Sequence, residues 1–320
     1  MSNKDNSFFK IFKKVNGFNV IKQYVKSRVF FYALLQVLVQ GKSKKSLEIV
    51  RNSVDNRILK KLRKKYIPYI LENKERILHD STERHSSDKV WVMWLQGMDN
   101  APKIVKKCYE SLMCNLPNKQ IILLTEQNYR DYVAFPDYIQ NKIDKGIITR
   151  THMSDLLRLE LLNQYGGTWI DATVFLSSRS IPNYMFQSDL FLFQNLKPGL
   201  NGQPRSVSTW FITAQRKHPI LVLTQELLYD YWSKNNHMMD YFLLHDFIEL
   251  SIETYQDEWK KIVPCSNSIP HILLLRLFDE YQEIIWNAVT EQTNIHKLSY
   301  KFKDTDWQRE GTYYRKIIEE

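Results

Sequence analysis

The chain has 320 residues, a formal net charge of +10, and 43% hydrophobic and 13% aromatic residues. With only nine Gly and ten Pro, this composition excludes a largely disordered or low-complexity chain and favours one enlarged domain with a real core. The three cysteines, Cys108, Cys114 and Cys265, lack the paired spacing of a metal site, and their odd number favours a reducing cytosol.

The positive charge is concentrated near the N-terminus, since residues 1–90 contain 21 Lys and Arg against 8 Asp and Glu. Such a segment suits an anionic membrane surface or a nucleic acid, and a solvated helical face is the alternative. Apolar residues at helical spacing predict a basic helical region over residues 1–80. We do not expect nucleic-acid binding, because the basic and aromatic residues lack the interleaving of common RNA modules.

The longest apolar run, residues 29–39, is about half of the roughly 20 residues that a membrane-spanning helix requires. It is therefore expected to lie on a membrane surface as part of a basic amphipathic anchor, or to pack on the protein. The basic residues near this run are Lys10, Lys13, Lys14, Lys22, Lys26 and Arg28.

Beyond a polar stretch at residues 79–88, expected to be a linker, short apolar runs alternate with helical patterns. Strands are predicted at 90–95, 120–125, 168–176 and 190–194, and helices at 104–116 and 154–165. In the second helix Ser154 is the expected N-cap, and Gly166 and Gly167 end it. The alternation predicts an α/β domain over residues 81–320, with a mostly parallel sheet and a ligand site at the carboxyl ends of its strands.

The segment 154–174 contains the side chains most suited to binding a ligand and to catalysis. Asp155 and Arg158 are three positions apart on a helix and so share one face. Asp171 and Thr173 are two positions apart near the end of a predicted strand and so point to the same side. The sequence therefore predicts that an acid and a guanidinium from the helix meet an acid and a hydroxyl from the strand.

This ordered block, S-D-x-x-R followed by Tyr-Gly-Gly and Asp-x-Thr, resembles family 32 glycosyltransferases and, more closely, the related capsular polysaccharide synthesis proteins. A weaker resemblance runs from about residue 89 to residue 303, and the first 80 residues match nothing that we can name. The resemblance implies a GT-A type nucleotide-sugar-binding fold in which Asp155 and Arg158 contact the donor sugar. It also places Gly166 and Gly167 at the donor site.

The resemblance further implies that Asp171 binds Mn²⁺ or Mg²⁺, which would neutralise the departing diphosphate. The usual second acid of the motif is Thr173 here, so weaker metal binding and a metal-independent reaction are both open. A late His and Lys often complete such sites, and His296 and Lys297 fit that order as a metal ligand and a diphosphate contact.

The resemblance also implies a base-binding loop after the strand at 90–95, where Trp94 would stack on uracil and Gly97 would allow close approach. For Trp94 a place in the core is the alternative, as it is for Trp91. On the acceptor side, His245 and Asp246 could meet the acceptor or act as a base, or could simply be buried. Residues 198–204 and 206–210, including Trp210, are expected to form a mobile wall over donor and acceptor, or an ordinary surface turn.

We therefore expect an enzyme that moves a hexose from a UDP-sugar to a lipid-linked capsular or exopolysaccharide acceptor, and the resemblance alone implies that it is retaining. The chain would be cytoplasmic and peripheral at the inner face of the plasma membrane. A protein or teichoic-acid-like acceptor, and a degenerate scaffold that binds nucleotide sugar without turnover, are the alternatives.

Overall fold

The computed structural model describes residues 17–81, 85–196 and 204–319, and Lys10, Lys13, Lys14 and most of the loop at 198–204 lie outside this range. A five-stranded sheet in the order β2-β1-β3-β6-β5 forms the centre. Its strands are β1 (Lys89–Met93), β2 (Gln120–Leu124), β3 (Gly167–Ile170), β5 (Leu190–Gln194) and β6 (Val207–Ala214). Only β6 runs against the other four strands. The predicted α/β class, with a mostly parallel sheet and an N-terminal helical region, is confirmed.

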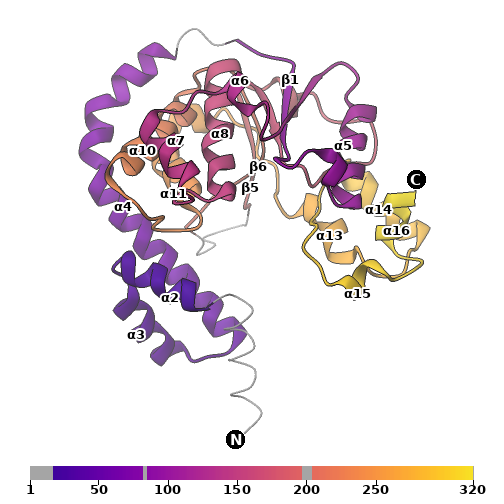
Figure 1. Cartoon of the computed structure of the whole chain (residues 1–320), viewed down its shortest axis with the longest axis horizontal. Helices are drawn as coiled ribbons and strands as arrows, with labels where there is room; N and C mark the ends of the chain where they lie inside the picture. The colour runs from indigo at the N-terminus through magenta and orange to yellow at the C-terminus, as the bar shows by residue number, and fades with distance from the viewer. Residues whose placement is uncertain (1–16, 82–84, 197–203, 320) are drawn as a thin grey trace, which may run out of the picture.

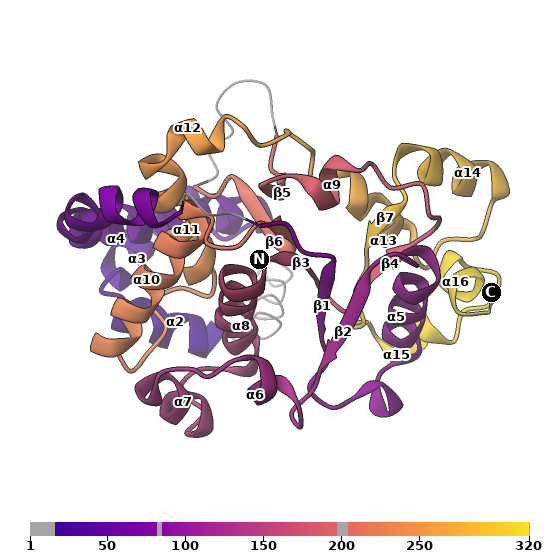
Figure 2. The ribbon, with the colours of Figure 1, turned by 90° about the horizontal axis from the view of Figure 1, so that it is seen from above.

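Helices cover both faces of this sheet (Figure 2). One layer contains α4 (Lys44–Asp80), α8 (Arg150–Tyr165), α10 (Pro219–Lys234) and α11 (Leu243–Thr254), and the other contains α5 (Lys103–Asn115), α13 (Ile272–Arg276), α14 (Glu283–Gln292) and α16 (Tyr313–Glu319). Strand side chains alternate between the two layers, as the two-residue period requires. Trp91 packs with the first layer, whereas Val90 and Val92 pack with the second.

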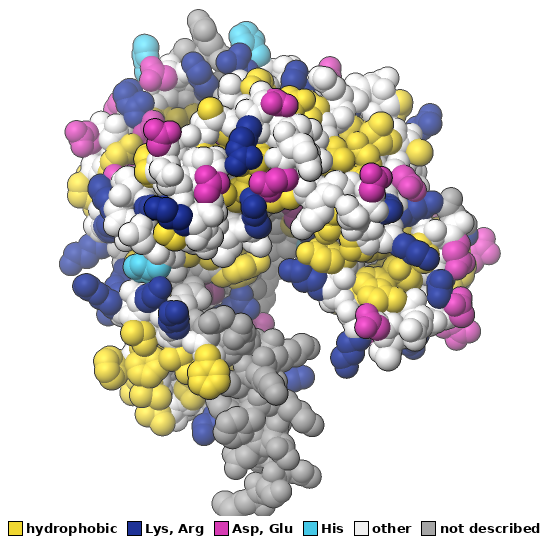
Figure 3. Space-filling model, in the orientation of Figure 1, with side chains coloured by type: hydrophobic (Ala, Val, Ile, Leu, Met, Phe, Trp, Pro, Cys, Tyr) yellow, Lys and Arg dark blue, Asp and Glu magenta, His cyan; other side chains and the backbone are white. Residues whose placement is uncertain are grey.

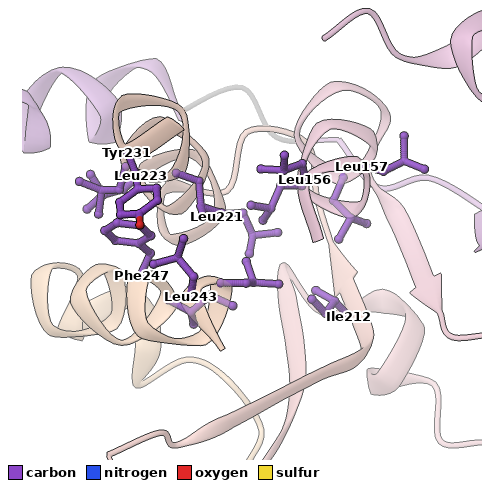
Figure 4. Close-up of a cluster of buried hydrophobic side chains, with 14 of the residues drawn as sticks. Leu156, Leu157, Ile212, Leu221, Leu223, Tyr231, Leu243 and Phe247 are labelled. Atoms are coloured by element: carbon purple, nitrogen blue, oxygen red, sulfur yellow. The ribbon is translucent and has the colours of Figure 1, made fainter. Parts of the chain in front are cut away.

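The larger of the two cores fills the space between the sheet and the helices α8, α10 and α11. Leu156 and Leu157 of α8 approach Ile212 of β6, and side chains from α10 and α11 close the cluster (Figure 4). Burial of each such side chain is worth about 1.5–3 kcal/mol. This core is what holds α8, and so its N-terminal half, against the sheet.

The N-terminal helices are α2 (Gly17–Lys26), α3 (Phe30–Gln40) and α4, and α4 packs onto the rest of the chain along its length (Figure 1). The ring of Tyr66 on α4 meets Phe247 of α11 edge to face at 5.0 Å. Val29, the N-cap of α3, and Ala33 on α3 are buried, whereas Phe31 and Leu38 of the same helix stay exposed. Among the described residues, no helix has the length and hydropathy that a membrane crossing demands.

A buried ionic cluster also fixes α4 to the domain. Arg205 lies at its centre and contacts Asp55 of α4 at 2.7 Å, Asp240 at 2.9 Å and Asp246 of α11 at 3.0 Å. The cluster therefore joins three segments that are far apart in the sequence. The predicted boundary at residue 80, where α4 ends, stays a prediction.

A second, two-stranded sheet pairs β4 (Val174–Leu176) antiparallel with β7 (Ile295–Lys297). The remaining elements are short and lie around the two sheets. They are η1 (Met98–Asn100), α6 (Tyr129–Tyr132), α7 (Asp137–Asp144), α9 (Tyr184–Gln187), α12 (Gln256–Trp259), η2 (Ile269–His271) and α15 (Asp304–Trp307).

Three local predictions differ from the structure. The expected strand at 168–176 is two strands, β3 and β4, separated by residues 171–173. Helix α8 begins at Arg150, because the Thr149 side chain caps it, and Ser154 lies inside the helix. Residues 206–210 do not form a mobile wall: β6 occupies 207–214, and all eight of its residues are buried between β3 and β5.

Candidate functional site

The break between β3 and β4 creates the site. Asp171 follows the last residue of β3, and its backbone N–H donates to the carbonyl of Trp210 at 2.8 Å, which anchors the start of the break to β6. Thr173 precedes β4, and its carbonyl accepts from the N–H of Leu298 at 2.8 Å. The register of β4 against β7 places Lys297 opposite Val174, one residue beyond Thr173. A segment more than a hundred residues away is thereby brought to the end of β3.

Helix α8 supplies the second half of the site. Arg158 Nη2 lies 3.4 Å from Asp155 Oδ1 and 3.7 Å from Asp171 Oδ1. The guanidinium lies 4.9 Å from the ring centre of Trp169 and donates to the carbonyl of Thr209, so its position is held from two sides. The structure therefore brings together the two acids and the guanidinium whose convergence the sequence predicts.

Asp171 carries the strongest electrostatic interactions of the site. Its Oδ2 accepts from Lys297 Nζ at 3.0 Å, and its Oδ1 accepts from Trp169 Nε1 at 3.0 Å. Burial alone would raise the pKa of Asp171, but the cations of Lys297 and Arg158 outweigh this effect and lower the pKa below its usual value. The carboxylate, 29% exposed, therefore stays ionised and faces the solvent between two cations.

The position next to Asp171 does not fit a divalent cation as the side chains are arranged. Lys297 Nζ donates to Thr173 Oγ1 at 2.6 Å as well as to Asp171, so an ammonium already bridges the two expected ligand atoms. No group of three His, Cys, Asp or Glu suited to a metal occurs in the described part of the chain. The binding of Mn²⁺ or Mg²⁺ here stays a prediction.

His296 does not reach this position. Neighbouring residues of a strand point to opposite sides, so His296 faces away from Lys297. Its Nε2 lies 3.0 Å from Ser177 Oγ, its side chain is fully buried, and its ring packs near Phe175. Burial lowers the pKa of His296 to about 4. The structure thus places His296 in the core, and its interpretation as a metal ligand is corrected.

Of the three acceptor-side candidates, only His245 lies beside the site. His245 Nε2 is 3.3 Å from Thr209 Oγ1, and the carbonyl of Thr209 accepts from Arg158. Burial lowers the pKa of His245 to about 4, so the ring is neutral near pH 7. The neutral ring can accept a hydrogen bond from a ligand in this position, but its low pKa makes it a weak base.

The other two acceptor-side candidates point elsewhere. Asp246 is fully buried and accepts from Arg205, and burial with the nearby charge of Asp240 raises its pKa well above the usual value. Trp210 is buried in the other layer, where it stacks on Phe193 at 4.6 Å and donates to Asn267 at 2.9 Å. Both interpretations as acceptor contacts are corrected, because these side chains are already enclosed and paired.

Trp94 and Gly97 follow β1 at the same edge of the sheet as Asp171, since β1 and β3 are parallel. The Trp94 ring meets Tyr300 edge to face at 5.2 Å, and its buried Nε1 has no hydrogen-bond partner among the described residues. The Gly97 N–H donates to the Trp94 carbonyl at 2.9 Å and closes a tight turn. Trp91, by contrast, is fully buried and donates to the Gly166 carbonyl at 3.0 Å.

Gly166 and Gly167 lie at the amino end of β3, at the opposite edge of the sheet from Asp171. Gly167 has a φ of +96°, and a Cβ at this position would lie 2.3 Å from the carbonyl oxygen of Lys89. A Cβ on Gly166 would lie 3.1 Å from the Ala214 carbonyl oxygen. These glycines allow close backbone packing, so their assignment to donor binding is corrected.

Sequence reasoning missed the side chains that hold the site in place. His152 Nδ1 lies 3.1 Å from Asp155 Oδ2, and Trp232 Nε1 donates to His152 Nε2 at 2.9 Å. Because Nε2 accepts, the ring proton lies on Nδ1 and is donated to Asp155. The three-residue spacing of His152 and Asp155 on a helix could have indicated their contact. Nothing in the sequence indicates that Trp232 of α10 contacts His152.

Comparison with known proteins shows which family the chain belongs to. The model of the family described as capsular polysaccharide synthesis protein matches residues 35–317. The chain belongs to this family. The predicted membership is confirmed, and the match includes every site residue described above. It also covers residues 35–80, so the expectation that the first 80 residues match nothing was wrong for that part.

Two individual proteins are similar to this family member. O-glycosyltransferase braB of Annulohypoxylon truncatum is 29% identical over 170 residues, which cover 46% of this chain and 38% of that protein. This chain therefore spans well under half of the length of that relative. Among solved structures, PaToxG Glycosyltransferase has a TM-score of 0.36 at 13% identity, over 83% of this chain and 98% of that one.

Proposed function

We propose that this chain is a retaining glycosyltransferase that moves a hexose from a UDP-sugar to a lipid-linked capsular or exopolysaccharide acceptor. The observation that carries the proposal is the convergence of Asp155, Arg158, Asp171 and Lys297 between α8, β3 and β7. Two carboxylates and two cations within contact distance of one another match a ligand with both hydroxyls and phosphates. Membership of a capsular polysaccharide synthesis family supports the same substrate class.

The cations have a direct role in this reaction. The bond between the anomeric carbon and the diphosphate oxygen breaks, and the oxygen keeps the electron pair. Arg158 and Lys297 stabilise the charge that develops on the diphosphate, which is the largest contribution that such sites make to rate. The acceptor oxygen bonds to the anomeric carbon and passes its proton to the departing phosphate. No protein nucleophile is required.

The carboxylates position the sugar. Asp155 is 13% exposed, its Oδ2 accepts from the His152 N–H, and its Oδ1 lies 3.4 Å from Arg158 Nη2. A sugar hydroxyl would donate to the remaining lone pairs of this carboxylate. The nucleotide base is proposed to lie at the carboxyl end of β1, against Trp94, whose indole N–H is buried without a partner among the described residues. An aromatic face and an unsatisfied donor are both suited to uracil.

A screen of UDP-sugars for hydrolysis and transfer tests the proposal. We expect one UDP-hexose to turn over, and Asp171→Asn to reduce kcat/KM by roughly 100-fold while leaving the melting temperature within a few degrees. Lipid extracts should accept the sugar, whereas soluble proteins and teichoic-acid-like polymers should not. If Asp171→Asn matched wild type, the site assignment would be wrong, and donor binding without any turnover would indicate a scaffold.

A lipid-linked acceptor lies in the membrane. We propose that the N-terminal helices bring the chain to it by contacting the anionic inner face of the plasma membrane. Hydrophobic side chains gather on the protruding helix α3 (Figure 3), where Phe31 is 83% and Leu38 is 74% exposed. Exposed Lys22, Lys26 and Arg28 lie on or next to α2. Apolar side chains with basic neighbours suit insertion into a membrane surface with anionic lipids.

Sedimentation with vesicles tests this contact. The full chain should bind vesicles that contain phosphatidylglycerol and should bind pure phosphatidylcholine weakly, because each nearby Lys or Arg contributes about 1 kcal/mol on an anionic surface. Leu38→Glu should abolish binding. Ile284→Glu, at a similarly exposed apolar residue (78%) on α14, is the matched control and should bind like wild type. Equal binding by both variants would rule out α3 as the contact.

A further inference from the structure

We infer that donor binding and transfer by this chain need no divalent cation, because the Lys297 ammonium occupies the place that the cation would take and supplies a positive charge there. The inference rests on the proposed function and concerns the same site. It follows from the positions of Lys297, Asp171 and Thr173, and from the backbone pairing that fixes them.

The first argument is the location of the ammonium. Lys297 Nζ is 2.6 Å from Thr173 Oγ1 and 3.0 Å from Asp171 Oδ2, and the third side-chain oxygen of the motif, Asp171 Oδ1, accepts from Trp169. A metal at this point would be bound at about 2.0–2.2 Å from such oxygens and so would occupy the space of the ammonium. The two cations exclude each other, because like charges at this separation repel strongly.

The second argument is the chemistry of the ligand atoms. Thr173 contributes a neutral hydroxyl where a second carboxylate would attract a hard cation. Lys297 suits this pair better, because an ammonium can donate to a carboxylate and to a hydroxyl at once. The local charges also balance, since Asp155 and Asp171 face Arg158 and Lys297. A metal would have to displace one of these cations from a carboxylate.

The third argument is that Lys297 is held by the fold. It belongs to β7, it pairs with Val174 of β4, and the next residue donates its backbone N–H to the Thr173 carbonyl. The Lys297 side chain is only 17% exposed, so it is confined to the site rather than extended into solvent. When a diphosphate arrives, Lys297 can direct its one remaining N–H toward a phosphate oxygen without leaving the pair.

Titration calorimetry with UDP in excess EDTA and in excess MnCl₂ tests the inference. Wild type should bind UDP with dissociation constants that agree within about twofold in the two buffers, whereas Lys297→Ala should lose roughly 100-fold in EDTA. Lys297→Arg keeps the charge and should retain most of the affinity. Lys260→Ala removes an exposed lysine that pairs with Asp257 at 3.1 Å, and it is the control that should bind like wild type.

A double variant tests the inference by a gain of metal-dependent binding, which damage to the fold would not produce. Thr173→Asp with Lys297→Ala restores two carboxylates and removes the ammonium, so it should bind UDP in MnCl₂ but not in EDTA. Electron paramagnetic resonance should then detect bound Mn²⁺ in the double variant and none in wild type. Circular dichroism and melting curves confirm that each variant is folded.

The outcomes separate the two proposals. Binding of UDP by wild type only in the presence of Mn²⁺, or unchanged binding by Lys297→Ala in EDTA, would overturn this inference and leave the proposed function standing. Absence of UDP binding by folded wild type in both buffers would overturn the proposed function and this inference with it.

Discussion

The double glycine before β3 leads to a prediction of large effect, because Gly167 has almost no room for a side chain. We expect Gly167→Ala to destabilise the fold far more than a Gly→Ala substitution at a position that has a positive φ but open space around it. A Cβ on Gly167 would lie 2.3 Å from the Lys89 carbonyl oxygen, about 1 Å closer than ordinary contact allows. The strands β1 and β3 must therefore separate at this end.

Gly146 provides the matched control. Its φ is +67°, but a Cβ there would meet nothing within 4 Å, so Gly146→Ala should cost only the backbone strain of about 1 kcal/mol. Gly167→Ala incurs the same strain and also disturbs the β1–β3 pairing and the bond from Trp91 Nε1 to the Gly166 carbonyl. With each lost hydrogen bond worth about 1 kcal/mol, the total loss should be about 3–4 kcal/mol.

Urea denaturation followed by circular dichroism measures both variants, and the midpoint of Gly167→Ala should fall well below that of Gly146→Ala. A loss within about 1 kcal/mol of the control would refute the reasoning, because β1 and β3 would then have tolerated the side chain. If Gly167→Ala had normal stability but bound UDP more weakly, the assignment of these glycines to the donor site would be supported instead.

Two further predictions concern histidines. The pKa of His296 is lowered to about 4 from its ordinary 6.5, so stability should be full above pH 6.5 and should fall by about 3 kcal/mol as pH drops to 4. Denaturation across this range should show a weaker pH dependence for His296→Leu, and an unchanged slope would contradict the burial argument. His152→Phe removes the donor to Asp155 and should lower kcat by roughly 10- to 100-fold, whereas His152→Asn should retain more activity. Equal kcat values for wild type and His152→Phe would exclude a positioning role.

The part of the site that could be predicted from sequence is the part carried by local periodicity. Asp155 and Arg158 share a helix face at a spacing of three residues, and Asp171 follows a buried strand, so both locations can be read from short windows. The helix boundary was less predictable, because Thr149 and Ser154 are both good capping residues and the choice depends on packing.

Long-range pairing accounts for what could not be predicted. Residues 207–214 are rich in strand-forming residues, but their place at the centre of the sheet depends on pairing with β3, about 40 residues earlier in the chain. The choice between His296 and Lys297 depends on the register of β7 against β4, because a shift of one residue exchanges their faces. Asp246 was likewise predicted to contact the acceptor, because the sequence does not show that the fold places Arg205 against it.

The pairing of β4 with β7 also determines when the catalytic constellation can exist during biosynthesis. Lys297 is separated from Asp171 by 126 residues, so a nascent chain carries the acids and the guanidinium long before it acquires the ammonium. Contacts of such separation form late, because a long loop must close first. Under the proposed function, a partly synthesised chain would therefore be unable to consume the sugar donor until β7 pairs with β4.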